Sequence, residues 1–121
     1  MGHVYLDIKI VGTRKSKVVT ALFDSGAYRN YIRSENMYDG ETPDDIGFHV
    51  FEGTEDVFPA DGRPVKVDLI RFKKVSFNGI TIEEPLFCVM RDLNWDAIVG
   101  VEIMQKFGII LDLENHRIIK K

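Results

Sequence analysis

Apolar and polar positions alternate along much of this chain with a period of two, which is typical of β-strands rather than helices. The first such run is Tyr5–Val11 and the second is Lys17–Phe23, with a turn-forming segment, Gly12–Lys15, between them. Two alternating runs joined by a short turn predict a β-hairpin. We therefore expect the chain to begin with two long antiparallel strands.

Two further hairpins are predicted in the middle of the chain. Asn78-Gly79 separates two short alternating runs, and this dipeptide favours the two-residue turns that join antiparallel strands. Asp61-Gly62 has the same character and separates Val57-Phe58 from Val65–Ile70. Additional strands are expected at Phe48–Phe51, Lys74–Phe77, Ile80–Ile82, Pro85–Met90 and Asp96–Val99.

Helical spacing is confined to short segments. Val101–Phe107 has apolar residues at helical intervals, and Gly108 ends the segment. Ser34–Tyr38 is expected to hold one helical turn capped by Ser34, and Asp39–Gly47 is expected to be an exposed connection. A final hairpin is predicted from Ile109–Leu113, the turn residues after it and Ile118-Ile119. Many short strands with about one helix indicate a mainly all-β barrel or sandwich.

Composition narrows the class of protein. A chain of 121 residues, 45% hydrophobic and 29% charged, is expected to form one domain, residues 1–121, with a core that needs no structural metal. Cys88 is the single cysteine, so no intrachain disulfide forms, in agreement with a reducing compartment. The net charge of −3 favours neither nucleic acid nor an anionic membrane. No signal peptide is visible at Met1–Leu6, and we expect a cytoplasmic protein.

Asp24 stands where an apolar strand meets Ser25, Gly26 and Ala27. It is either a turn carboxylate that accepts backbone N–H groups or one half of a catalytic pair. Two carboxylates held close together cannot both ionise and share a proton, so one serves as a base for water and the other as an acid. Gly26 permits the tight turn that would place the carboxylate at the end of its strand.

Two motifs in a fixed order carry a resemblance to a known family. "LFDSGAYRNYI" and "DAIVGVEIMQKFGIILDL" resemble the two hallmarks of the retropepsin-like aspartic proteases, the retroviral proteases and their single-lobed cellular or prokaryotic relatives. The resemblance covers roughly Val4 to Ile119. It implies a single-lobed, closed acid-protease-like β-barrel with one short helix near the C-terminus.

The resemblance also implies roles for particular residues. Asp24 would be catalytic, and Ser25, Gly26 and Ala27 would form the active-site turn, with Ser25 bonding across to the partner's turn. The hairpin tip Ala60, Asp61 and Gly62 would be the flap that closes over a peptide or protein substrate. It has one glycine, Gly62, where the retroviral proteases have several. No cofactor and no metal are implied.

The Asp-Ser-Gly motif occurs once in the chain. A second catalytic aspartate would therefore come from a second copy, because two-fold symmetry places identical residues face to face. The sequence thus predicts a homodimeric aspartic endopeptidase with one composite site, and no nucleic-acid or membrane partner.

Other interpretations remain open. The same fold could be a non-catalytic peptide-binding or assembly module. More remotely, an unrelated β-barrel could bind a small molecule, with Asp24 in an ordinary turn. Cys88 is expected to be a buried small hydrophobe, and Asp96 and Asp112 to cap or pair at element ends. The three histidines, His3, His49 and His116, lack metal-ligand spacing.

Overall fold

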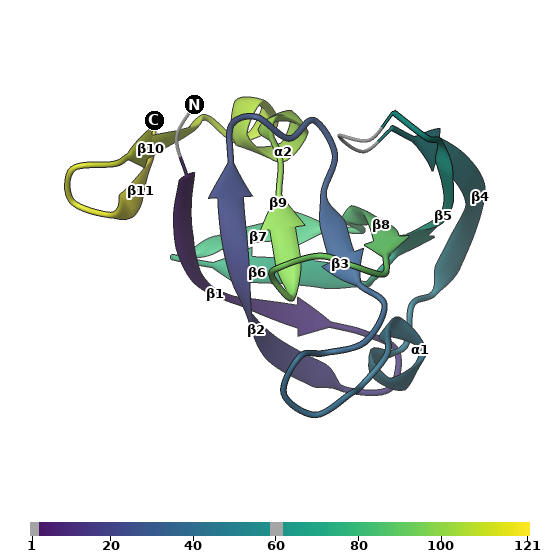
Figure 1. Cartoon of the computed structure of the whole chain (residues 1–121). Coiled ribbons are helices and arrows are strands. Elements are labelled where there is room, and N and C mark those ends of the chain that lie inside the picture. The colour runs from purple at the N-terminus through teal and green to yellow at the C-terminus, as the bar shows by residue number, and fades with distance from the viewer. Residues whose placement is uncertain (1–2, 59–61) are drawn as a thin grey trace.

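The computed structural model of this chain describes residues 3–58 and 62–121. Their structure is mostly β, as the sequence predicts, with two short helices (Figure 1). The strands of the first half are β1 (His3–Val11), β2 (Ser16–Asp24), β3 (Tyr31–Arg33), β4 (Val50–Val57) and β5 (Val65–Arg71). The later strands are β6 (Lys74–Phe77), β7 (Ile80–Glu83), β8 (Leu86–Met90), β9 (Ala97–Val99), β10 (Ile109–Asp112) and β11 (Arg117–Lys120). The helices are α1 (Pro43–Ile46) and α2 (Val101–Lys106).

Nine strands form one sheet in the order β4-β5-β8-β3-β9-β2-β1-β6-β7, and β10 and β11 form a separate pair. This order has two ends, β4 and β7. The closed barrel that the sequence predicts is therefore not confirmed, because no pairing among the described residues joins these two end strands.

The predicted first hairpin is confirmed. β1 and β2 pair antiparallel along their whole length, from His3 opposite Asp24 to Val11 opposite Ser16. β2 also pairs in parallel with β9. Asp24 therefore ends a strand that has a neighbour on each side.

Large apolar side chains fill the core between the layers of this folded sheet. Phe23 packs edge-on against Phe77 with ring centroids 4.9 Å apart, and Phe72 packs against Phe87 at 5.7 Å. All four rings are buried. Cys88 is buried as a free thiol, as predicted, and burial raises its pKa to about 11.

The other two predicted hairpins in the middle of the chain are also present. β6 and β7 are joined by Asn78 and Gly79, whose φ angles of 47° and 76° are those of the predicted turn. β4 and β5 also pair antiparallel, with Val57 opposite Val65. β4 is one strand of eight residues, so the separate strands expected at Phe48–Phe51 and Val57-Phe58 are corrected to a single one.

The segment between β3 and β4 differs from the prediction. Ser34–Tyr38 holds no helical turn; the side chain of Asn36 accepts the backbone N–H groups of Tyr38 and Asp39 in a local turn instead. The helix lies in the predicted exposed connection, as α1, where Thr42 and Asp45 form a reciprocal capping box. Its residues Pro43 and Ile46 are buried, and the carbonyl of Ile46 accepts the N–H groups of Arg14 and Lys15 in the β1–β2 turn.

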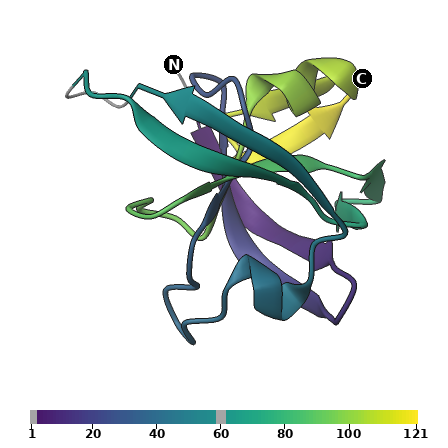
Figure 2. The same ribbon diagram turned by 90° about the vertical axis from the view of Figure 1, so that its right-hand side faces the viewer.

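The C-terminal elements agree with the prediction. α2 is followed by Gly108 at φ 66°, and β10 and β11 form the final hairpin. α2 and this hairpin lie at one end of the molecule and α1 at the opposite end (Figure 2). No helix in the described part of the chain is long and apolar enough to cross a membrane.

Candidate active site

Asp24 is the last residue of β2 and is half-buried. Buried Ala21, Leu22 and Phe23 hold the strand that leads to it. The Asp24 carboxylate Oδ1 accepts the N–H of Gly26 at 2.8 Å, and the Asp24 carbonyl accepts the N–H of Ala27 at 3.1 Å. These two bonds shape a tight turn in which Ser25 and Gly26 are exposed.

The N-terminus of α2 packs against the loop that follows this turn. The carbonyl of Ala27 accepts the N–H of Val101 at 2.7 Å, and that of Tyr28 accepts the N–H of Glu102 at 3.2 Å. A Cβ on Gly100 would overlap the carbonyl of Arg29 and lie 2.7 Å from the carbonyl of Ala27. The contact therefore requires glycine at position 100, which explains the apolar-apolar-glycine motif in the sequence.

Asn30 joins the same segments from inside the fold. Its side chain is 2% exposed; Oδ1 accepts the N–H of Gly100 at 3.0 Å, and Nδ2 donates to the carbonyl of Leu86 at 3.0 Å. Sequence reasoning did not identify this role. No pattern around Asn30 in the sequence distinguishes it from an ordinary surface residue.

The predicted flap belongs to the hairpin of β4 and β5, but its tip is described only in part. Ala60 and Asp61 lie outside the described residues. Gly62 is described, and no atom lies within 4 Å of the position that a Cβ would take there. Phe58, on the β4 side, is exposed. The structure thus brings Asp24, Ser25, Gly26 and Ala27 together and leaves the flap assignment untested.

An apolar hollow of about 280 Å³ lies beside the Asp24 turn. Its walls come from the turn, α2 and β10, with side chains of Ser25, Val101, Met104, Ile109, Leu111 and Leu113. Leu113 is 53% exposed, and the neighbouring hairpin also exposes Ile110 and Ile119. Apolar side chains therefore gather on the surface next to the candidate catalytic residue.

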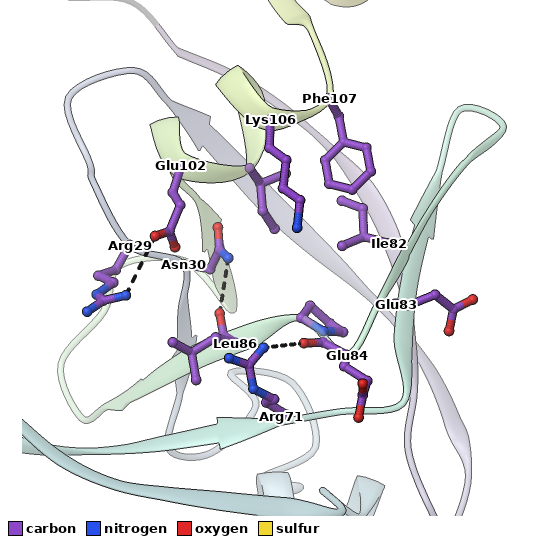
Figure 3. Close-up of a pocket in the computed structure, with 12 residues that line it drawn as sticks. Arg29, Asn30, Arg71, Ile82, Glu83, Glu84, Leu86, Glu102, Lys106 and Phe107 are labelled. Atoms are coloured by element: carbon purple, nitrogen blue, oxygen red, sulfur yellow. Dashed lines mark hydrogen bonds and ion pairs between the residues drawn. The ribbon is translucent and has the colours of Figure 1, made fainter.

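A second cavity, of about 290 Å³, lies below α2 and is lined by charged groups (Figure 3). Arg29 and Glu102 form an ion pair at its rim, and Arg71 donates to the carbonyl of Glu84. A hydrogen bond to Glu55 raises the pKa of Arg29 above its usual value. Among the described residues, no group of three or more His, Cys, Asp or Glu side chains is arranged to hold a metal ion.

Comparison with known proteins identifies the fold. No protein-family model and no curated protein sequence matches the chain. Solved structures do match, and two of them are retropepsin-like or retroviral protease-like. One is a retropepsin-like aspartic protease from Rickettsia conorii, with 20% identity, a TM-score of 0.66 and coverage of 98% of this chain and 82% of that one.

The other structure is the retroviral protease-like domain of Ddi1 from Leishmania major, with 20% identity, a TM-score of 0.64 and coverage of 100% of this chain and 90% of that one. The chain therefore has a retropepsin-like fold over nearly its whole length. The resemblance inferred from the sequence is confirmed at the level of the fold, and the interpretation as an unrelated β-barrel is wrong.

Proposed function

We propose that this chain is an aspartic endopeptidase whose site is completed by Asp24 of a second copy. The observation that carries the proposal is the position of Asp24, in a turn at the end of a central strand, within a retropepsin-like fold. α2 and Asn30 brace the loop after that turn. Such bracing is the kind of support that a catalytic carboxylate needs to keep its geometry.

The proposed reaction uses the two aspartates as one unit. The ionised carboxylate removes a proton from a water molecule, which attacks the carbonyl carbon of the scissile peptide bond. The protonated carboxyl group stabilises the carbonyl oxygen and supplies the proton that the leaving amine needs. Because one proton is shared, the titration of the site belongs to the pair. Ser25 would bond across to the partner's turn and keep the carboxylates in register.

The surface beside the turn supports self-association. The apolar hollow lined by Met104, Ile109 and Leu113 adjoins Ser25, so a second copy seated there would also bring its own Asp24 turn close. β10 and β11 form a separate two-stranded sheet that is anchored to the core by Ile109 and Ile118 and exposes Ile110 and Ile119. Its open strand edges would accept added strands from a partner.

The remaining predictions accompany this proposal. The β4–β5 hairpin would be the flap, with Ala60, Asp61 and Gly62 at its tip, and it would bond the backbone of an extended peptide as an added strand. A single domain over residues 1–121 and a cytoplasmic location remain predictions.

The test is incubation of the protein with a diverse peptide library from acidic to neutral pH, with and without a transition-state-mimicking aspartic-protease inhibitor. We expect inhibitor-sensitive cleavage that disappears in Asp24→Asn, while circular dichroism and the dimer are unchanged. Asp44→Asn, in α1 at the opposite end of the molecule, is the matched control and should cleave normally. Full activity in a clean Asp24→Asn preparation would refute the proposal, and peptide binding without cleavage in the wild type would favour the non-catalytic module.

A further inference from the structure

Arg29 connects three segments that are far apart in the chain. It lies in the loop after the Asp24 turn, and its Nη2 donates to Oε1 of Glu55 in β4 at 2.8 Å. Its Nη1 lies 3.7 Å from Oε2 of Glu102 in α2. The guanidinium also lies 5.6 Å from the centre of the Tyr28 ring. One side chain therefore contacts the candidate catalytic loop, the helix that braces it and an edge strand of the sheet.

Glu55 lies on the part of β4 that follows a β-bulge, where the strand can bend. β4 is an end strand of the sheet and pairs only with β5 among the described strands. The register between these strands shifts by one residue between Phe51 and Gly53, which makes a β-bulge, and bulges bend a strand. Gly53 has a φ of 102° and open space around it. Beyond this bulge, residues 54–57 of β4 and 65–67 of β5 form an arm, since the pairing of β5 with β8 begins at Asp68.

A second arginine–glutamate pair lies at the bulge itself, where Glu52 is the extra residue of β4. Nε of Arg71 donates to Oε1 of Glu52 at 2.8 Å. Arg71 belongs to β5, so this pair joins two neighbouring strands at the base of the arm and makes no link to the Asp24 loop. Both arginines line the charged cavity below α2 (Figure 3). The two pairs are alike in chemistry and distance but differ in what they connect.

From this arrangement we propose that Arg29 is a positioning residue, which clamps the β4–β5 arm to the Asp24 loop through Glu55. Without the pair, the arm is held to the rest of the fold by the continuation of β5 and by the buried side chain of Val67, and it swings more freely about the bulge. The clamp itself does not depend on whether the protein is an enzyme. Its effect on peptide cleavage rests on the proposed function, because only there does the arm hold a substrate near Asp24.

The physical clamp is tested by hydrogen exchange of backbone amides, measured by NMR in the Asp24→Asn background so that no cleavage interferes. Glu55→Gln should speed exchange in residues 54–57 and 65–67 by about three-fold, the size expected for a partly exposed ion pair. Glu52→Gln is the matched control and should leave these amides unchanged beyond the bulge. In about 1 M salt, the amide exchange rates of the protein with Glu55 intact should approach those of Glu55→Gln, because salt screens exposed charges.

The kinetic consequence is measured separately in the active protein. Glu55→Gln should raise KM for a cleaved peptide by about three-fold, with kcat changed by less than about two-fold, since the arm holds ground state and transition state alike. Equal exchange in Glu55→Gln and Glu52→Gln would overturn the clamp. Faster exchange with unchanged KM would overturn its link to substrate binding. If no variant cleaves any peptide, the proposed function fails, while the exchange result still decides the clamp.

Discussion

The buried side chain of Asn30 holds the backbone of Gly100, 70 residues further along the chain, with its Oδ1 3.0 Å from the amide nitrogen. The same side chain donates to Leu86, so one amide group links the Asp24 loop, the N-terminus of α2 and the start of β8.

Asn30→Ala should destabilise the fold by about 2–4 kcal/mol, because it leaves the buried N–H of Gly100 and C=O of Leu86 without partners. Urea unfolding followed by circular dichroism measures this loss. Asn94→Ala, at an exposed position, is the control and should change the free energy of unfolding by less than about 0.5 kcal/mol. Equal effects of the two substitutions would contradict the bracing role of Asn30.

Gly100→Ala should be more damaging than an ordinary glycine replacement. Its added methyl group would overlap backbone oxygens of the loop at residues 27–29, which cannot move aside like a flexible side chain. Gly79→Ala is the matched control, since it costs about 1–2 kcal/mol through its left-handed φ alone and meets no neighbouring atom. Thermal unfolding of both variants tests the difference. If Gly100→Ala were more stable than Gly79→Ala, the close approach of the backbone at position 100 would not need glycine.

Leu113→Arg should weaken self-association by at least about ten-fold, because it places a charge in the proposed apolar interface. Sedimentation velocity across a concentration series measures the change, and any cleavage activity should fall with the fraction of dimer. Tyr38→Arg changes an aromatic side chain that is 91% exposed in the loop before α1 and should leave the association unchanged. A wild-type protein that stays monomeric at every concentration would contradict the proposed interface.

Asp112 should stabilise the C-terminal hairpin at neutral pH and lose this effect in acid. Hydrogen bonds from Asn115 and then Arg117 hold the pKa of Asp112 below its usual value. A lowered folded-state pKa means that the stabilisation is complete above the unfolded pKa, about 3.9, and disappears as pH falls through the folded pKa. Asp112→Asn should therefore lower the melting temperature at pH 7 but not near pH 2. A difference of equal size at both pH values would exclude this linkage.

Local patterns predicted most of the strands. The alternation of apolar and polar residues indicated the β1–β2 hairpin, and Asn78-Gly79 indicated the β6–β7 turn. The short strand β3 was missed because its partners are distant: Tyr31 lies opposite Cys88 in β8 and Ile98 in β9. Three residues carry too little periodicity to reveal a strand of that kind.

The error at α1 has a different cause. Thr42 and Asp45 carry the spacing of a capping box, yet the polar residues around them indicated an exposed connection. The helix is only four residues long, and short helices depend on packing more than on propensity. Its packing partner is the β1–β2 turn, where the N–H groups of Arg14 and Lys15 donate to the carbonyl of Ile46.

By itself, the sequence determined the hairpins, the single copy of Asp24-Ser25-Gly26 and the order of the two motifs, because each depends on residues that are neighbours in the chain. Only the tertiary structure decided that Asn30 holds Gly100, that Arg29 reaches Glu55, and that an apolar hollow adjoins Ser25. These contacts join residues 26 or more positions apart, and hydrogen bonding or packing over such separations leaves no period in the sequence.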